Sequence, residues 1–179
     1  MGSSKASQST AGREKGMTNG AKRTNKVYAV LQTILLCIFT AAVFFAPGER
    51  LLLAGKIPRV VGNALSFAGL LLLFGGIKSL GRAIQVNPEP RPDATLVTSG
   101  IYKWFRHPIY TAIVIIVAGM FLRRSSPIIG LAALIVIAYL AVKVWFEERL
   151  LLARYPEYSE YKKRSWGLLP LLHSFTSKL

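Results

Sequence analysis

Cysteine is almost absent from this chain, since Cys37 is the single one among 179 residues. One thiol cannot form an internal disulfide framework, and a metal site built from several cysteines is excluded as well. Histidine is nearly as scarce: His107 and His173 are the only two, and neither has a partner at metal-ligand spacing. We therefore expect no metal cofactor.

Charged side chains are missing from four long stretches, which are residues 27–48, 60–77, 108–122 and 125–142. A helix needs about 20 apolar residues to cross the hydrocarbon core of a bilayer. Three of the stretches reach or approach that length, whereas the third has 15 residues and would need flanking aromatics or a helical hairpin with the fourth. The sequence predicts an all-α integral membrane protein with about four transmembrane helices, helices 3 and 4 forming a hairpin.

Acidic residues are also few. Eight Asp and Glu against 23 Lys and Arg give a formal net charge of +15, beside a hydrophobic fraction of 52%. A nucleic-acid-binding protein of this charge would spread it along its length, whereas here it is confined to the stretches between apolar runs. We expect membrane lipids as neighbours and no nucleic-acid partner.

The basic residues also predict how the chain is oriented. The polar segments on the same side of the membrane as the N-terminus hold six, five and seven Lys or Arg, 18 in total. The segments on the opposite side hold three and two, 5 in total. Because basic loops stay inside, the N- and C-termini of this multi-pass protein are both expected in the cytoplasm. Residues 1–26 are Ser-, Thr-, Gly- and Lys-rich, which predicts a disordered basic cytoplasmic tail rather than a cleaved signal.

Three regions follow from this pattern. The tail covers residues 1–26, transmembrane helices 1 and 2 lie within residues 27–86, and residues 87–179 form a core with helices 3 and 4 and a C-terminal cytoplasmic segment. Within the core, three prolines in residues 85–92 exclude a helix there. The polar, aromatic and basic stretch at residues 155–164 is expected at the surface, and residues 166–172 are expected to dock on the bilayer or on other helices.

Prolines and glycines predict the helix ends and one helix contact. Pro108 and Pro127 suit the first turns of the third and fourth helices, the latter preceded by a Ser cap. The second helix should run from just after Pro58 to about residue 80. Its Gly62, Gly69, Gly75 and Gly76 would allow close helix packing in lipid.

Two groups of polar residues flank the last two apolar runs. Arg106 and His107 precede the helix expected from Pro108, where free N–H groups favour an anionic ligand, although both residues could simply anchor the helix at lipid headgroups. Lys143 and Glu147 are spaced i, i+4 on one helix face. A Lys just inside the membrane boundary is costly unless it is paired, functional or snorkels to the interface.

The order of these motifs resembles one enzyme family. The run LVTSGIYKWFRHPIY at residues 96–110, the pair Glu147–Glu148, the run EYSEYKKR at residues 157–164 and a closing LLP are similar to the isoprenylcysteine carboxyl methyltransferase family. Related phospholipid methyltransferases share the Arg-His-Pro and paired-Glu pattern. The resemblance covers about half of the chain, from roughly Asn87 to Leu172, and is most specific in the TSGxYxWxRHPxY stretch.

The resemblance implies a membrane methyltransferase that binds S-adenosyl-L-methionine without a Rossmann domain, in a cytoplasmic pocket closed by the C-terminal segment. A lipid-like or prenylated methyl acceptor would enter from the membrane. The residues implied to contact the cofactor are Asn87, Ala94, Thr95, Leu96, Val97, Tyr102, His107, Pro108, Ile109, Tyr110 and Glu147. Lys143 and Arg106 are the expected catalytic residues, which would hold the acceptor.

Several residues depart from the family's pattern. Lys143 stands where the lipidated-cysteine enzymes have an Arg that contacts the substrate carboxylate, and it lacks the planar fork of that side chain. Ala94 stands where those enzymes have His, and Asn87 stands where they have Gln. Thr111, directly after the HPxY motif, begins a pair of residues that often includes Gly in the family. One residue is missing between Glu148 and Tyr158. These changes bear on the acceptor more than on the cofactor.

The chemistry of methyl transfer favours an acidic acceptor. A sulfonium is already an activated methyl donor, so the protein mainly has to align the acceptor with it. A carboxylate is ionised at pH 7 and needs no general base, whereas an amine or thiol would need one, and His107 is the one evident candidate. The sequence therefore predicts carboxyl O-methylation, with Lys143 or Arg106 holding the acceptor.

Three alternatives stay open. Phospholipid N-methyltransferases share the Arg-His-Pro and paired-Glu motifs. Sterol-type reductases that use NADPH have a similar C-terminal helical half. A non-enzymatic membrane scaffold with a basic cytosolic face is the third, but it leaves the pairing of the two motifs unexplained.

Overall fold

The computed structural model describes residues 27–45, 55–81 and 96–168. The chain divides into two compact units, Met1–Ile38 and Phe39–Leu179. In the first unit, the described residues belong to the helix Val27–Phe45, which continues into the second unit. The expected tail at residues 1–26, and Asn87, Ala94 and Thr95 of the expected cofactor site, lie outside the described residues.

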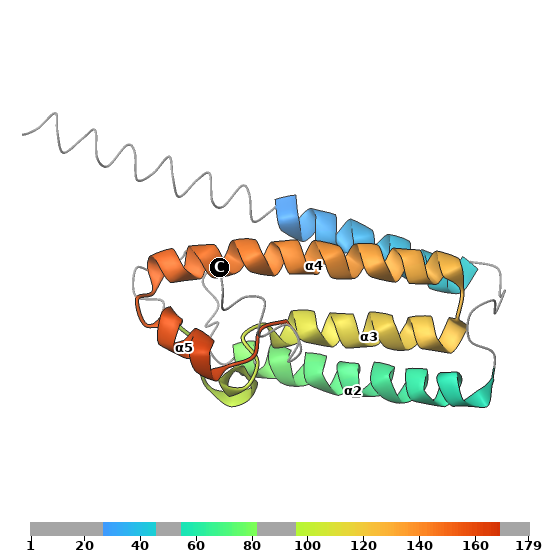
Figure 1. The fold of residues 1–179 in the computed structure, drawn as a ribbon, viewed down its shortest axis with the longest axis horizontal. Coiled ribbons are helices and arrows are strands. Elements are labelled where there is room, and N and C mark those ends of the chain that lie inside the picture. Colours follow the sequence, from blue (N-terminus) through green and yellow to red (C-terminus); the bar gives the residue numbers. More distant parts are fainter. Residues whose placement is uncertain (1–26, 46–54, 82–95, 169–179) are drawn as a thin grey trace, which may run out of the picture. The chain divides into compact units, whose positions relative to one another are not determined.

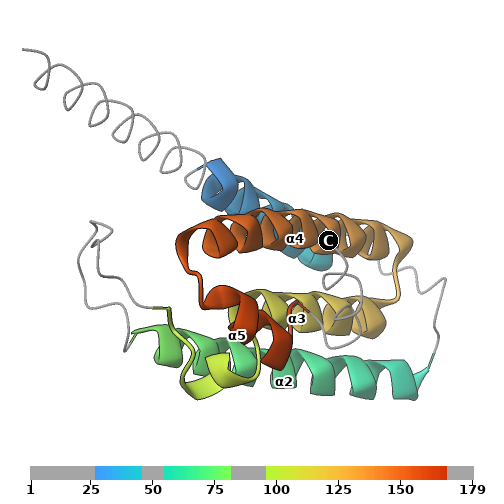
Figure 2. The ribbon, with the colours of Figure 1, turned by 60° about the vertical axis from the view of Figure 1, so that its left-hand side comes forward.

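The second unit is helical. Its described elements are α2 (Lys56–Gly81), the 3-10 helix η1 (Gly100–Lys103), α3 (Pro108–Arg124), α4 (Pro127–Arg154) and α5 (Tyr158–Arg164). Helices α2, α3 and α4 alternate in direction, and the short α5 lies beside the start of α3 (Figures 1 and 2). The described residues contain no β-strand beyond an isolated bridge between Phe105 and Trp166, so the all-α architecture agrees with the prediction.

Three described helices are long and apolar enough to cross a membrane: Val27–Phe45, Lys56–Gly81 and Pro127–Arg154. Large apolar side chains such as Phe67 and Phe74 on α2 and Leu131 and Leu134 on α4 are exposed, as lipid-facing side chains are. The chain is therefore a multi-pass integral membrane protein. Helix α3 has 17 residues, fewer than the roughly 20 of a typical span, so the fourth crossing stays a prediction.

The helix starts follow the proline pattern. Pro108 and Pro127 occupy the first turns of α3 and α4, where a missing N–H costs nothing and the fixed φ suits the helix. Ser126 is the N-cap of α4, as expected, although its side chain makes no capping hydrogen bond. Ser125 takes the left-handed conformation at φ 53°, which lets the chain reverse tightly between α3 and α4.

Glycines bring α2 and α3 into backbone contact; the sequence predicted the close packing, and the structure shows the partner helix. A Cβ placed on Gly62 would lie 2.5 Å from the carbonyl oxygen of Gly119, and one on Gly69 would lie 2.7 Å from Cγ1 of Ile116. Gly76 faces the first turn of α3 in the same way, with Ile109 at 3.2 Å. Helices in lipid associate by such close packing, because apolar burial gives no advantage over contact with the acyl chains. This contact places the start of α3 against the end of α2.

Substituting Gly119 with alanine is expected to destabilise the α2–α3 pair. The new Cβ would lie 2.5 Å from Ser66 Oγ and 2.6 Å from the Gly62 carbonyl oxygen, so the helices must separate, at a cost of about 1–3 kcal/mol. Thermal unfolding in detergent measures the effect. Gly81→Ala is the matched control, because a Cβ there meets nothing within 4 Å. Equal unfolding temperatures for the two variants would contradict the close contact.

The prediction that residues 155–164 lie at the surface is wrong for two of the three tyrosines. Tyr158 is 1% exposed and Tyr161 is 3% exposed. They are three residues apart in α5, so they share one helix face, while Lys163 and Arg164 on the other side remain exposed. Only the polar half of this amphipathic turn faces solvent.

Candidate active site at the start of helix α3

Charged side chains gather where α3 begins and the C-terminal half of α4 passes it. The loop before α3 supplies two of them, α4 supplies three and α5 one. The six residues are Arg106, His107, Lys143, Glu147, Glu148 and Lys162. Four basic side chains and two carboxylates at the end of an apolar bundle are costly unless they pair or act on a ligand.

Glu147 is the centre of the first half of this cluster. Its Oε1 accepts a hydrogen bond of 2.9 Å from the hydroxyl of Tyr110 and lies 3.8 Å from Nζ of Lys143. The same ammonium is 4.9 Å from the centroid of the Tyr110 ring, within cation–π range. Lys143 is only 8% exposed, so its charge is directed into the protein and does not snorkel outward.

His107 lies between the two carboxylates. Its Nδ1 is 3.9 Å from Oε2 of Glu147, and its Nε2 is 3.5 Å from Oε1 of Glu148. Nε2 is buried and has no hydrogen-bond partner among the described residues. The imidazole stacks on Tyr110 with ring centroids 5.7 Å apart and planes at 12°. A buried ring nitrogen without a partner marks a place where a ligand could bond.

Arg106 is the centre of the second half. Its Nε donates a 2.9 Å hydrogen bond to Oε1 of Glu148, and both side chains are buried. Its Nη1 donates to the carbonyl oxygens of Lys162, at 2.7 Å, and Ser165. Nζ of Lys162 lies 3.0 Å from the other oxygen of Glu148. Arg106 thus joins α4 to the end of α5 through charge-assisted bonds, which are the strong kind.

The segment after α5 docks on the residues that lead into α3. The backbone N–H of Arg106 donates to the carbonyl of Trp166, and the N–H of Trp166 donates to the carbonyl of Trp104, each at 2.8 Å. Thr111 adds a side-chain bond of 2.7 Å to the carbonyl of Leu168. The described part of residues 166–172 therefore docks on protein, and residues 169–172 lie outside the description.

The buried face of α5 completes the enclosure. The hydroxyl of Tyr161 donates a 2.5 Å hydrogen bond to the carbonyl of Tyr102 in η1, and its ring meets Tyr158 edge-on at 5.8 Å. Burial raises the pKa of Tyr161 to about 12, so the hydroxyl stays a donor at neutral pH. The pKa of Tyr102 is raised by burial as well. Helix α5 is thereby held against η1 and the start of α3.

Most of the residues singled out from the sequence meet here. His107, Tyr110, Lys143 and Glu147 form one connected group, with Arg106 beside it. Pro108 and Ile109 form the first turn of α3, and Tyr102 lies in η1. Leu96 and Val97 are half-buried and in no regular element, and no contact places them in the group.

Sequence reasoning named Glu148 only as part of the paired-Glu motif, without a role, and it missed Lys162. One signal could have predicted the burial of Glu148: it extends the face of α4 formed by Val136, Leu140 and Val144, each four residues apart, and that face is buried. A carboxylate on such a face needs a basic partner. Lys162 carries no comparable signal, because its role depends on where α5 docks.

These features define a class of protein. The phospholipid methyltransferase family matches residues 57–158, more than half of the chain, and the chain belongs to this family. The match extends over α2, α3, α4 and the first residue of α5. The enzyme class predicted from the Arg-His-Pro and paired-Glu motifs is confirmed at this level.

Individual relatives refine the comparison. The chain is 38% identical to human Protein-S-isoprenylcysteine O-methyltransferase over 120 residues, which are 60% of this chain and 42% of that protein. It is 31% identical to the nickel-cobalt-cadmium resistance protein NccN of Alcaligenes xylosoxydans xylosoxydans over 49% of this chain and 42% of that protein. It is 34% identical to the cobalt-zinc-cadmium resistance protein CzcN of Cupriavidus metallidurans over 46% of this chain and 38% of that protein. The chain thus matches about two fifths of the length of these relatives.

Proposed function

We propose that this protein transfers the methyl group of S-adenosyl-L-methionine to a membrane-embedded, lipid-like acceptor, in the manner of a carboxyl O-methyltransferase of the isoprenylcysteine type. The observation that carries the proposal is the joining of Tyr110, Lys143 and Glu147 at the start of α3. It supplies an anion and a cation side by side at the end of a bundle that crosses the membrane. The likeness to the human carboxyl methyltransferase supports the same reaction.

The residues present fit the cofactor chemically. Glu147, oriented by Tyr110, would bind the ribose hydroxyls or the positive end of the cofactor, and the imidazole of His107, whose Nε2 makes no hydrogen bond among the described residues, could offer a further one. The stacked His107 and Tyr110 rings provide an aromatic wall. We also retain the other cofactor contacts implied by the family resemblance. They are Asn87, Ala94, Thr95, Leu96, Val97, Tyr102, Pro108 and Ile109. When bound, the cofactor supplies an activated methyl group on a sulfonium.

Lys143 is the proposed residue for the acceptor. A carboxylate is already ionised at neutral pH, so the chain need only hold it in line with the methyl group and remove its water. A buried ammonium attracts such an anion strongly, because little solvent screens the charge. The Glu147 carboxylate and the Tyr110 ring keep Lys143 in place without taking it out of reach.

Arg106 is given a different role from the one its sequence position suggested. Its guanidinium is buried and bonded to Glu148 and to two carbonyl oxygens near the end of α5, so it has little capacity to grip an acceptor. We propose that it is a positioning residue, which holds His107 and the segment after α5 over the cluster. This segment would close the cofactor site and exclude water.

The membrane orientation is part of the proposal. With both termini in the cytoplasm, the cluster lies on the cytoplasmic side, where S-adenosyl-L-methionine is available. The excess of 18 basic residues over 5 supports this arrangement.

Phospholipid N-methylation is the second candidate, and the family match favours it specifically. An amine acceptor would have to lose a proton, and the buried imidazole of His107 is the candidate base in the cluster. The comparisons favour either methyl transfer over the reductase alternative. Methyl incorporation from labelled cofactor, measured separately in total phospholipid and in a prenylcysteine analogue, distinguishes the two acceptors.

The first test is calorimetric binding of S-adenosyl-L-methionine to the purified protein in detergent. His107→Ala and Glu147→Ala are each expected to weaken binding about tenfold or more, because each removes a hydrogen bond to a polar or charged ligand group. Glu160→Ala is the matched control, since this carboxylate is exposed on α5 and pairs with Lys163. Wild-type protein that binds no cofactor would refute the proposal.

A further inference from the structure

A cavity separate from the Glu147 cluster lies between η1 and α5. It encloses about 380 Å3 and is lined by Thr98, Lys103, Trp104, Tyr161 and Arg164. Its two charged lining residues, Lys103 and Arg164, are both cations with exposed side chains, and no acidic residue lines it in the described part of the chain. The space is within the usual range for small-ligand pockets, which begins at about 300 Å3. Its chemistry differs from that of the cluster around Glu147.

The cavity lies at the depth where the apolar helices end. Ile101 of η1 packs against Gly75 near the end of α2, where a Cβ would lie 3.1 Å from Cδ1 of Ile101. Gly100 lies against Ser79 at φ 62°, where a Cβ would come within 2.9 Å of Oγ. The uncharged part of helix α2 ends at Lys78, and α3 begins a few residues after η1. That depth is occupied by lipid headgroups in a bilayer.

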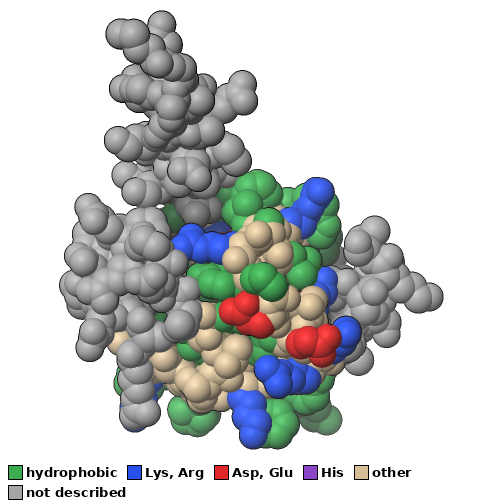
Figure 3. Space-filling model, turned by 90° about the vertical axis from the view of Figure 1, so that its left-hand side faces the viewer, with side chains coloured by type: hydrophobic (Ala, Val, Ile, Leu, Met, Phe, Trp, Pro, Cys, Tyr) green, Lys and Arg blue, Asp and Glu red, His purple; other side chains and the backbone are tan. Residues whose placement is uncertain are grey.

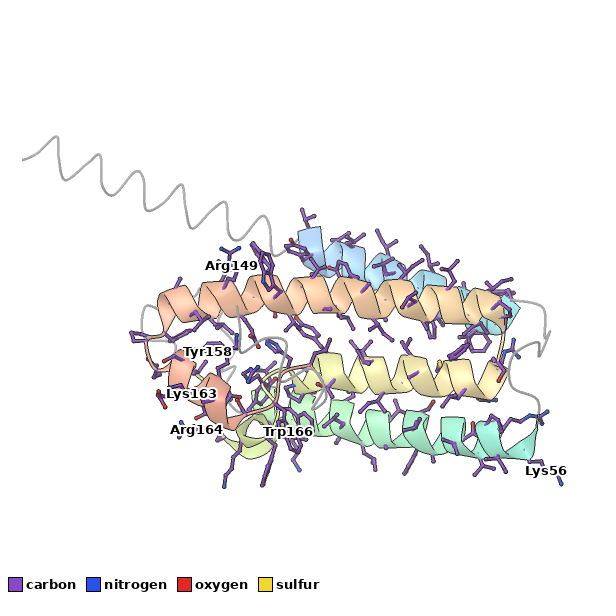
Figure 4. All side chains as sticks on the ribbon, in the orientation of Figure 1. Lys56, Arg149, Tyr158, Lys163, Arg164 and Trp166 are labelled. Atoms are coloured by element: carbon purple, nitrogen blue, oxygen red, sulfur yellow. The ribbon has the colours of Figure 1, made fainter. Side chains whose placement is uncertain are left out.

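Two exposed tryptophans mark the same level. Trp104 is 60% exposed and lines the cavity, and Trp166, at 43%, packs edge-on against Phe105. Tryptophan is enriched at the membrane–water interface, where its ring sits among the headgroups. In Figure 4, Arg164 and Trp166 both lie on the side of α4 that faces α5, whereas Arg149 projects from the other side of α4. Figure 3 shows further Lys and Arg side chains on this end of the molecule.

The lining groups select for phosphate. The guanidinium of Arg164 can grip two phosphate oxygens at once, and the ammonium of Lys103 adds a point charge from the facing element. The hydroxyl of Tyr161 is already bonded to the Tyr102 carbonyl, so its ring forms the wall. Since none of the described lining residues is acidic, none of them would attract the ammonium of a zwitterionic headgroup.

We propose that this cavity binds the phosphate of an anionic phospholipid headgroup, at a site separate from Lys143 and Glu147. Bound there, the lipid would tie α5 to η1 at the membrane surface. The inference does not depend on methyl transfer, since it follows from the cavity's charge, aromatic residues and depth.

Native mass spectrometry of the full chain in detergent tests the proposal. The probes are palmitoyl-oleoyl phosphatidylglycerol, phosphatidylcholine with the same chains, and inorganic phosphate. Wild-type protein should retain phosphatidylglycerol in preference to phosphatidylcholine, and K103Q/R164Q should bind it about tenfold more weakly or worse. Inorganic phosphate at millimolar concentration should not displace it, because the acyl chains add affinity.

The matched control is R149Q/K163Q, which removes two cations outside the cavity. Neither lines the cavity: Arg149 stacks on Trp145, and Lys163, although next to Arg164 in α5, pairs with Glu160. An equal loss in both double variants would overturn the proposal in favour of general surface attraction. Binding of inorganic phosphate with no preference for phosphatidylglycerol would overturn the lipid assignment. If K103Q/R164Q fails to fold, Arg164→Lys should retain more phosphatidylglycerol than Arg164→Gln, and equal retention would count against the site.

Discussion

Lys143→Ala is expected to lower methyl transfer to a prenylcysteine analogue about 100-fold or more while the affinity for S-adenosyl-L-methionine changes little. The ammonium is buried beside Glu147 and the Tyr110 ring, so its attraction for a carboxylate acceptor is weakly screened. Removing one preorganised electrostatic group from an enclosed site typically costs a factor of about 100 to 1,000. Initial rates with labelled cofactor, together with calorimetry, measure both quantities.

Lys143→Arg provides the matched control for this prediction. It preserves the charge and restores the fork that the resembled enzymes place here, so it should keep most of the activity. A purely structural Lys143 would give a different pattern, because the alanine variant would then lose cofactor binding and thermal stability together. That outcome would contradict the division of roles between Lys143 and Glu147.

Arg106→Ala is expected to destabilise the protein by about 3 kcal/mol or more, because a buried carboxylate loses one of its basic partners and two carbonyl oxygens lose their donor. Glu148 would lose its 2.9 Å bond to Nε, and the carbonyl oxygens of Lys162 and Ser165 would lose their shared donor. For a chain of this size the thermal unfolding temperature should fall by about 10 °C or more. Unfolding in detergent, followed by near-ultraviolet circular dichroism, measures it.

Lys163→Ala is the control for that result. It breaks the Lys163–Glu160 pair, which is on the exposed face of α5, and exposed pairs add little because water screens them. Its unfolding temperature should match that of the wild type. If Arg106→Ala were equally harmless, Arg106 would not be the residue that joins α4 to α5, and the acceptor role inferred from sequence would regain its support.

Lys143 and Arg106 also explain why the paired glutamates differ. Glu147 is partly exposed and faces Tyr110 and Lys143, whereas Glu148 is buried and faces Arg106 and Lys162. Successive residues in a helix point about 100° apart, so one motif serves two environments. One carboxylate is available to a ligand, and the other holds the C-terminal segment in place.

The sequence by itself determined the helices and the chemical class. Uncharged runs mark the spans because hydrocarbon tolerates no charge, and Pro108 and Pro127 mark helix starts because proline suits the first turn. The motif at residues 96–110 identified the family, and the glycines of α2 predicted a close helix contact, although not its partner α3. Each of these depends on local spacing along the chain, which a sequence displays directly.

Only the tertiary structure decided which polar groups meet. Arg106 lies 42 residues before Glu148 in the chain and 56 before Lys162, and nothing local indicates that either is its partner. The burial of Tyr158 and Tyr161 likewise depends on where α5 docks, so the surface expected from their polar neighbours was wrong. Partner choice is a matter of distance in space, because a buried charge is stabilised by whichever opposite charge the fold brings within reach.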